Sequence, residues 1–224
     1  MKLKTELLRL EDPGLSMDER ARRRLQLSKK FEGAGDFGSA RQALGDLWQR
    51  VGARPQLQGL KDELTIGEVL LRVGALTGWI GSSQQIEEAQ AVAKDLLSES
   101  VGVFERLGDS GYVAEAQTEL AYCYWREGAF DEARVILKEV LRQLDEKERE
   151  RRAVAIVRLA IVETSTKRYS DALQLLTDSA SLFEESSTSG VKGRFHNELA
   201  NVLNYLSVAE NRKDYVDRAL VEYA

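Results

Sequence analysis

The stretch AYCYWREGAFDEA, residues 121–133, decides the fold of this chain. If the stretch begins in a helix, Ala121 and Tyr124 lie on one buried face, because residues three or four apart are neighbours on a helix surface. Gly128 is well suited to end that helix, since glycine adopts the left-handed conformation common at helix C-termini. Asp131 is well suited to the first turn of a second helix. The stretch therefore predicts two antiparallel helices joined by a short turn.

The second helix of the pair supplies the residues that pack against the first. Phe130 is expected to plug the turn, and Ala133 is small enough to let its helix approach the first one closely. Leu137 and Val140 continue an apolar stripe at helical spacing. A helix pair of this kind cannot bury both of its apolar faces alone, so further copies of the pattern are expected.

The pattern recurs along the sequence. LQLSKKFEGAGDFGSAR at 25–41 aligns without a gap with TELAYCYWREGAFDEAR at 118–134, and VRLAIVETSTKRYSDAL at 157–173 has the same register. Two more copies of the first helix begin at Leu70 and Phe195. Each copy has a small residue at the same place in its first helix, which we call the anchor. The anchors are Ser28, Gly74, Ala121, Ala160 and Ala200.

The copies differ in length. Nineteen positions separate Gly74 from Ala93 in the second copy, whereas twelve separate Ala121 from Ala133 in the third. The fifth copy has the longer interval as well. The difference amounts to about two helical turns, which would lengthen a helix or the connecting loop without reversing the buried face.

This recurring pattern resembles the tetratricopeptide repeat family over roughly residues 16–224. The resemblance implies an all-α fold, a right-handed superhelical solenoid of about five antiparallel helix pairs in a single domain, 1–224. The expected repeats are 16–54, 64–108, 112–146, 151–186 and 190–224. Successive anchors are 46, 47, 39 and 40 residues apart, longer than the family's usual spacing of about 34. Such lengths are similar to variants found in bacterial regulatory and scaffold proteins.

The two ends of the array carry signals of their own. Ser16 and Glu19 have the spacing of a capping box, which predicts the start of the first helix. At the other end, Leu220, Val221 and Tyr223 form an apolar edge. Because a solenoid normally covers such an edge, we expect further repeats or a second copy of the chain to pack there.

Composition agrees with a helical protein and disfavours several classes of function. Of the 224 residues, 43% are hydrophobic and two are proline, and alternating β-branched runs are scarce. The net charge of -5 disfavours a nucleic-acid partner. The N-terminus lacks the apolar core of a signal peptide, and nowhere do eighteen apolar residues run together. We therefore expect a cytoplasmic protein with no membrane partner.

Enzyme and metal chemistry find little support. Cys123 has no second cysteine to pair with, and His196 cannot anchor a multi-histidine metal site, so both are expected to serve packing or the helix surface. Residues 33–38 read GAGDFG and match a dinucleotide-binding motif. That motif requires a preceding strand, whereas the preceding residues predict a helix, so we interpret it as an inter-helix turn. We predict no catalytic residue, cofactor, metal site or enzyme activity.

The first helices of successive tetratricopeptide repeats line a concave groove, which is where such proteins bind their partners. The resemblance therefore implies a protein or peptide partner and a set of groove positions. In this chain they are Glu68, Trp79, Thr118, Tyr122, Trp125, Arg126, Val157, Ile161, Arg194, Asn197, Asn201, Asn204 and Tyr205.

The groove positions include three distinct groups. Asn197, Asn201 and Asn204 put three amides on one helix face, where they are expected to hold the backbone of an extended peptide or to form a hydrated polar surface. The aromatic residues are expected to be partner anchors or part of the core. Val157 and Ile161 are expected to form the floor of an apolar pocket.

Three functions compete on these observations. The first is a non-catalytic scaffold that recognises a protein segment in its groove. The second is a regulatory sensor module that tightens around a peptide or small ligand and signals to a partner or effector domain. The third, an enzyme, would need a nucleophile or an acid-base pair that the sequence does not show. We favour the scaffold, by analogy with the fold.

Overall fold

The computed structural model describes residues 14–184 and 189–223, and the regular secondary structure within these ranges is helical throughout. The elements are α2 (Met17–Gly33), α3 (Phe37–Leu44), the short 3-10 helix η1 (Gly45–Leu47), α4 (Glu63–Ser83), α5 (Ala89–Leu107), α6 (Ser110–Arg126), α7 (Phe130–Gln143), α8 (Arg149–Ser165), α9 (Tyr169–Asp178), α10 (Ala180–Glu184), α11 (Ser189–Ala209) and α12 (Lys213–Tyr223). Each predicted repeat begins with a long helix and continues with a shorter one, so the all-α array of about five helix pairs is confirmed.

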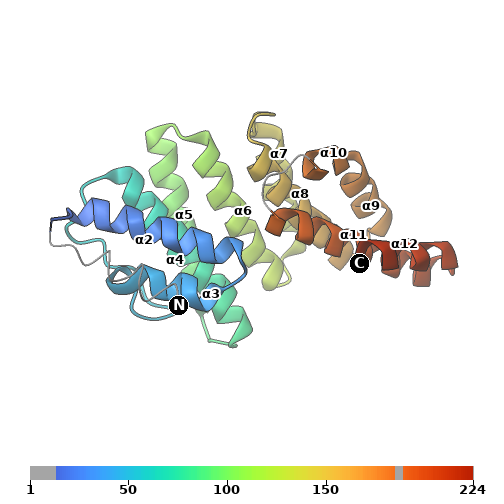
Figure 1. Ribbon diagram of the computed structural model, residues 1–224, viewed down its shortest axis with the longest axis horizontal. Coiled ribbons are helices and arrows are strands. Elements are labelled where there is room, and N and C mark those ends of the chain that lie inside the picture. Colours follow the sequence, from blue (N-terminus) through green and yellow to red (C-terminus); the bar gives the residue numbers. More distant parts are fainter. Residues whose placement is uncertain (1–13, 185–188, 224) are drawn as a thin grey trace. The chain divides into compact units, whose positions relative to one another are not determined.

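The described residues form two compact units, which meet in the chain at Arg126 and Glu127: unit 1 comprises those up to Arg126, and unit 2 those from Glu127 on. Unit 1 contains α2 to α6, and unit 2 contains α7 to α12 (Figure 1). The boundary falls between the two helices of the third predicted repeat. The single domain and the right-handed superhelical course that the sequence implies stay predictions.

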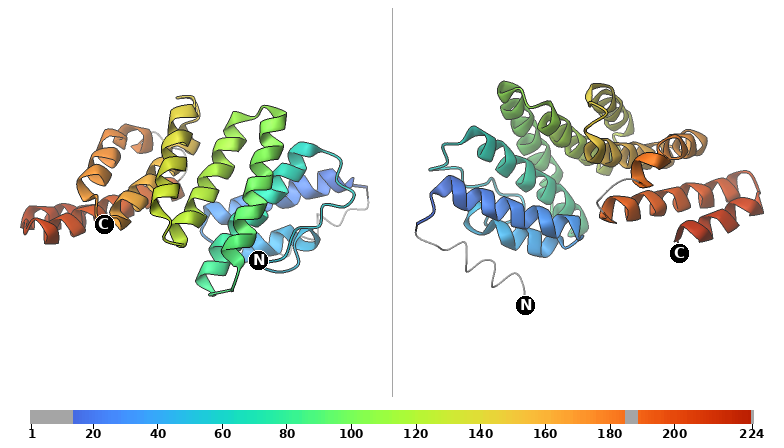
Figure 2. Two further views of the ribbon diagram at one scale, coloured as in Figure 1. Left: turned by 180° about the vertical axis from the view of Figure 1, so that it is seen from behind. Right: turned by 45° about the horizontal axis from the view of Figure 1, so that its top comes forward.

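The core of unit 1 is built around the contact between α4 and α5, which lie side by side (Figure 2). Gly74, the anchor of α4, lies at one of the places where the two helices approach each other closely. A Cβ atom at this position would lie 2.8 Å from the Cγ atom of Leu97 and 3.3 Å from the carbonyl oxygen of Ala93. The small anchor therefore has the predicted role, because a larger residue would push α5 away.

α4 is long and apolar enough to span a membrane by length and composition alone. In this structure 78% of that stretch is buried inside the protein. Val69, Leu70 and Val73 are among its fully buried residues, and α2, α5 and α6 all pack against it. A central place in a protein core therefore accounts for the apolar character of α4.

The extra residues of the second and fifth copies lengthen the first helix of each pair. α4 and α11 have 21 residues each, whereas α6 and α8 have 17. Of the two alternatives left open by the sequence, a longer helix accounts for at least four of the added residues.

Local signals at the helix ends behave as predicted. The Ser16 hydroxyl oxygen accepts a hydrogen bond from the Glu19 backbone N–H at 3.2 Å, and the Glu19 carboxylate accepts one from the Ser16 N–H at 2.9 Å, which completes the capping box. Residues 33–38 contain the turn between α2 and α3, which consists of residues 34–36. In this turn Gly35 has a φ of +75°, and the Asp36 side chain caps α3.

α6 partly differs from the prediction. Gly128, in the turn before α7, has a φ of +81°, as the opening stretch predicts. Ala121 is fully buried, but Tyr124, expected in the core, is only half-buried. Tyr122 and Cys123 are more deeply buried, at 9% and 1% exposed. Because α6 packs against both α4 and α5, its buried face is wider and is turned toward these two residues.

Unit 2 is built around α8, which packs against α7, α9 and α11. Residues 153–162 of this helix, AVAIVRLAIV, are apolar almost all round, and the structure covers them accordingly. Ala160 is fully buried and Val157 is 4% exposed. Phe183 of α10 stacks on Phe195 of α11 with ring centroids 4.2 Å apart, which extends this core toward the C-terminal helices.

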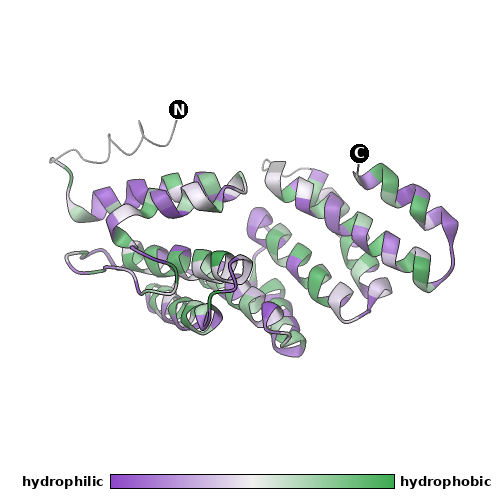
Figure 3. Cartoon of the chain, turned by 90° about the horizontal axis from the view of Figure 1, so that it is seen from below, coloured by the Kyte–Doolittle hydropathy of each residue, from purple (hydrophilic) through white to green (hydrophobic). Residues whose placement is uncertain are grey.

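The predicted apolar edge is present on α12. Leu220 and Val221 are 62% and 74% exposed, and Val216 is 40% exposed. Figure 3 shows hydrophobic residues, in green, along the helix that leads to the C-terminus. The Tyr223 side chain and Ala224 lie outside the described residues. That another repeat or a second copy covers this edge stays a prediction.

Gly74→Ala is expected to destabilise the protein although alanine has the higher helix propensity. The propensity gain of about 1 kcal/mol is outweighed by overlap with α5, since overpacking costs about 1–3 kcal/mol. We expect a net loss of up to about 2 kcal/mol in the free energy of unfolding, measured by urea denaturation.

Gly102→Ala is the matched control. Gly102 also lies inside a helix, α5, but its Cβ atom would meet nothing nearer than Arg106 Nη1 at 3.7 Å. This variant should gain about 0.5–1 kcal/mol. If both variants were stabilised equally, the close approach at Gly74 would not limit the packing.

Candidate functional site

The predicted groove residues are distributed over the first helices of both units. In unit 1, α4 packs against both α2 and α6. On this α2–α4–α6 face, the predicted residues are Glu68, Trp79, Thr118, Tyr122, Trp125 and Arg126. In unit 2, α8 packs against α11. On this α8–α11 face, the predicted residues are Val157, Ile161, Arg194, Asn197, Asn201, Asn204 and Tyr205.

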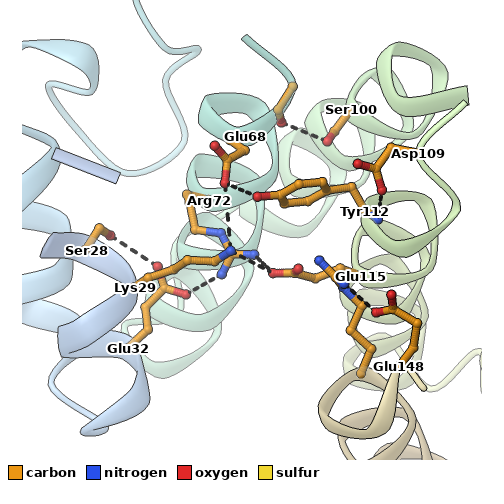
Figure 4. Close-up of polar contacts among 12 residues, drawn as sticks. Ser28, Lys29, Glu32, Glu68, Arg72, Ser100, Asp109, Tyr112, Glu115 and Glu148 are labelled. Atoms are coloured by element: carbon orange, nitrogen blue, oxygen red, sulfur yellow. Dashed lines mark hydrogen bonds and ion pairs between the residues drawn. The ribbon is translucent and has the colours of Figure 1, made fainter. Parts of the chain in front are cut away.

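A buried arginine joins the three helices of the α2–α4–α6 face. Arg72 of α4 is 6% exposed. Its Nη1 donates to Glu32 Oε2 of α2 at 2.9 Å, and its Nη2 donates to Glu115 Oε1 of α6 (Figure 4). Because each bond crosses to a different helix, Arg72 holds α2, α4 and α6 in register.

Lys29 and Tyr112 extend this network. The Lys29 ammonium lies 3.8 Å from both Glu68 Oε1 and Glu115 Oε1, and the Tyr112 hydroxyl donates to Glu68 Oε1 at 2.6 Å (Figure 4). The Lys29 Nζ also lies 5.2 Å from the centroid of the Tyr112 ring. Glu68, predicted to contact a partner, is therefore engaged by neighbours within the chain.

The network keeps Arg72 charged. Burial alone lowers the pKa of its guanidinium, but the charges of Glu32, Glu115 and Glu119 outweigh burial and raise that pKa. Burial raises the pKa of the Glu32 carboxyl, and the charge of Arg72 acts in the opposite direction. The charge of Arg72 therefore offsets part of the effect of burial on Glu32.

An aromatic row lies across α3, α4 and α6. It consists of Phe37, Trp79, Tyr122 and Trp125, with successive ring centroids 4.7, 5.3 and 4.8 Å apart. The Arg126 guanidinium lies 4.4 Å from the centroid of Trp79 and 4.2 Å from that of Tyr122. The structure thus brings four predicted groove residues together, and it covers their ring faces with contacts inside unit 1.

Two other predicted residues lie below the surface. Thr118 is 4% exposed, and its hydroxyl donates to the Ala114 carbonyl at 2.6 Å. Val157 belongs to the core of unit 2, and Ile161 packs against the same core while remaining partly exposed. Neither Thr118 nor Val157 reaches a partner without rearrangement.

The asparagine row reaches the surface of the α8–α11 face. Asn197 and Asn204 are exposed and Asn201 is half-buried, so the predicted spacing places the three amides on one side of α11. Arg194 is exposed one turn before the row. Tyr205 is 49% exposed. The face therefore presents amides, a cation and an aromatic ring together.

Glu198 lies beneath this row and was missed by the sequence prediction. It is 6% exposed and accepts hydrogen bonds from the Thr164 hydroxyl at 2.8 Å and from Asn201 Nδ2 at 3.4 Å. Burial raises the pKa of its carboxyl. Like Arg72, it is a charged residue inside an apolar helical stripe, and that pattern is the signal that could have identified both.

A second feature of unit 2 is a pocket of about 440 Å³. It is lined in part by Phe183, Phe195 and Leu199. At its rim, His196 Nδ1 lies 2.7 Å from Glu222 Oε2, so His196 is on the helix surface as predicted. None of the predicted groove residues lines this pocket.

The two faces differ from a metal centre in the residues that they expose. Across the two described ranges, no group of three or more His, Cys, Asp or Glu side chains is placed to hold a metal ion. Cys123 is buried among apolar side chains in unit 1. The functional groups at the surface are amides, aromatic rings and charged groups.

Comparisons with known proteins agree with this architecture. Residues 112–185 match the family described as "Tetratricopeptide repeat". The TPR-like repeats of a putative kinesin light chain from Podosopora anserina are 18% identical to this chain, with 93% of this chain and 97% of that chain covered and a TM-score of 0.57. BtubC (BKLC) from P. vanneervenii is 15% identical, with 99% and 91% covered and a TM-score of 0.62. No curated protein matched the chain.

The fold and its surfaces define a helical-repeat protein. The matched segment, about a third of the chain, is similar to the tetratricopeptide repeat family, and the likeness to solved structures shows the TPR-like fold over almost the whole chain. Domains of this family are typically protein-interaction scaffolds and are generally non-catalytic.

Arg72→Ala is expected to lower the free energy of unfolding by about 3–5 kcal/mol, because it leaves Glu32 and Glu115 largely buried without the guanidinium. Urea denaturation measures this loss. The control is Arg22→Ala, which removes an exposed cation 3.7 Å from Asp62 and should change stability by less than about 0.5 kcal/mol. Equal effects of the two substitutions would show that the buried network adds nothing.

Glu198→Gln is expected to raise the melting temperature near pH 7. Because burial raises the folded-state pKa of Glu198, its contribution to stability is fully present below the unfolded pKa, near 4.5, and is lost as the pH rises through the folded pKa. Glutamine still accepts a hydrogen bond from Thr164 but has no charge to bury. Calorimetry should therefore find the largest difference near neutrality and almost none at about pH 4. A lower melting temperature at neutral pH would contradict this.

Proposed function

We propose that this chain is a non-catalytic scaffold that binds a protein or peptide segment in the concave groove predicted along its first helices. The observation that carries the proposal is the exposed amide row on α11. Asn197 and Asn204 are exposed on one face of a helix, although asparagine in a helix interior has a lower propensity than alanine. Binding of a partner segment would explain why asparagine occupies these two positions of α11.

The row suits an extended peptide. An asparagine side chain offers two donors and an acceptor, so successive amides match the alternating N–H and C=O groups of a peptide backbone. Arg194 supplies a cation at one end of the row, and Tyr205 supplies a half-exposed ring at the other. Val208, 80% exposed one turn beyond Asn204, adds an apolar surface. Backbone recognition gives affinity, and these flanking groups give selectivity.

Unit 1 contributes in a different way. On the α2–α4–α6 face, Arg72, Lys29 and Glu68 are paired with one another or with neighbours, and Arg126 covers the aromatic row. Such a surface is stiff, because its polar groups are already satisfied. We therefore assign partner selection to the α8–α11 face, where the amides are exposed.

The double variant Asn197→Ala and Asn204→Ala tests this proposal. Both side chains are exposed, so folding should be kept while two partner contacts are lost. With about 1 kcal/mol for each hydrogen bond, the affinity should fall roughly tenfold to thirtyfold. The wild type first captures partners from lysate, and the affinity of a purified partner for each variant is then measured by calorimetry.

The control variant combines Gln174→Ala and Asp178→Ala. Both residues are exposed on α9, which is the second helix of its pair. Like the test variant, the control removes two exposed polar side chains, one of them an amide. The control should bind as the wild type does. If both double variants bound the partner unchanged, the α8–α11 face would not be the binding surface.

The sensor alternative gains one observation, the pocket beside Phe183 and Phe195. Its volume and stacked rings suit a small ligand with an apolar group. Compounds that raise the melting temperature of the wild type but not of His196→Ala would favour this function. We also propose, from the sequence, that the protein is cytoplasmic and that its repeats are of the bacterial type. The exposed C-terminal edge is proposed to be covered by another repeat or a second copy of the chain.

A further inference from the structure

Four first helices carry a charged residue two positions before the anchor. These residues are Arg72 in α4, Glu119 in α6, Arg158 in α8 and Glu198 in α11, so the sign alternates along the chain. Arg72, Arg158 and Glu198 are 6%, 5% and 6% exposed. A charge buried to this degree is costly unless its neighbours compensate it.

Arg72 shows how unit 1 provides this compensation. Glu32, which bonds to Nη1, stands four positions after the anchor of the preceding first helix, α2. Glu115, which bonds to Nη2, stands six positions before the anchor of the following first helix, α6. The charge of Arg72, two positions before its anchor, is therefore neutralised by carboxylates from the preceding and the following first helix.

Glu198 makes the first of these contacts, but with a neutral partner. Thr164 stands four positions after the anchor of α8, as Glu32 does in α2, and its hydroxyl donates to Glu198 Oε1. Glu198 Oε2 accepts from Asn201 at 3.4 Å, which is long for a hydrogen bond. In the part of unit 2 that the structure describes, the groups that act on this carboxylate are the neutral side chains of Thr164 and Asn201.

We propose that the counter-charge comes from the partner: Glu198 receives an arginine or lysine side chain of the segment bound along the α8–α11 face. This inference rests on the proposed function and names the chemistry of its partner. The long bond from Asn201 to Oε2 is exchanged for a charge-assisted one. Arginine suits the position best, because a guanidinium donates two parallel hydrogen bonds to a carboxylate.

The surroundings of Glu198 fit a long basic side chain. Asn197 and Asn204 flank the position with exposed amides, which hold the backbone on either side of the basic residue. Ile161 of α8 is partly exposed next to Thr164 and offers an apolar surface to the methylene stem. A basic side chain thus compensates the buried charge that the fold itself leaves with neutral partners.

A positional library of N-acetylated, C-amidated decapeptides tests this inference. Three proteins are screened: the wild type, Glu198→Gln, and the control Glu210→Gln, which neutralises an exposed carboxylate just after α11. The wild type and the control should select arginine or lysine at one peptide position. Glu198→Gln should still capture peptides through the amide row but show no preference at that position.

The contribution of the basic side chain to affinity is measured with the selected peptide and with a version that has citrulline in place of the basic residue. Citrulline keeps the shape of arginine and lacks its charge. The wild type should bind the arginine peptide about tenfold more tightly than the citrulline peptide. Glu198→Gln should bind the two about equally, and its melting temperature shows that it is folded.

The outcomes separate the inference from the proposed function. Peptide capture by the wild type without a basic preference, or a basic preference that survives in Glu198→Gln, overturns the inference and leaves the scaffold proposal standing. If neither the wild type nor the control captures any peptide, the proposed function fails and the inference fails with it.

Discussion

The structure depends on the close approach of neighbouring helices at the anchors. At Gly74 even a methyl group would overlap α5, and Ala121, Ala160 and Ala200 are fully buried. Because the helices are so close, the residues around the anchors have little exposure to solvent. A charged residue in the same stretch therefore has to find its partner on a neighbouring helix, so the packing that makes the array also determines where buried charge is tolerated.

The two units meet this requirement differently. Arg72 has carboxylates on both sides, and with Lys29 and Tyr112 it makes the α2–α4–α6 face a network that satisfies itself. Glu198 occupies the same position relative to its anchor, and among the described residues its side-chain partners are the neutral groups of Thr164 and Asn201. The difference explains why we assign selective binding to the second surface, since a partner gains most where a buried charge is not yet compensated.

Local patterns in the sequence were reliable wherever the structure is decided by neighbours along the chain. The capping box at Ser16 and the turn at Gly128 depend on a few consecutive residues, and both formed as predicted. The side of α11 that carries Asn197 and Asn204 also followed from spacing alone. Tyr124 did not follow its pattern, because α6 meets two helices of unit 1 and buries a wider face than one helix pair requires.

The sequence by itself determined the helices, their pairing into repeats and the small residues at the closest contacts, because these follow from periodicity and residue volume. Only the tertiary structure decided which charges meet. Arg72 reaches Glu32 forty residues away in the chain, and Thr164 reaches Glu198 across thirty-four. Such partners depend on how adjacent helices are placed against each other, and no single helix carries that information in its own spacing.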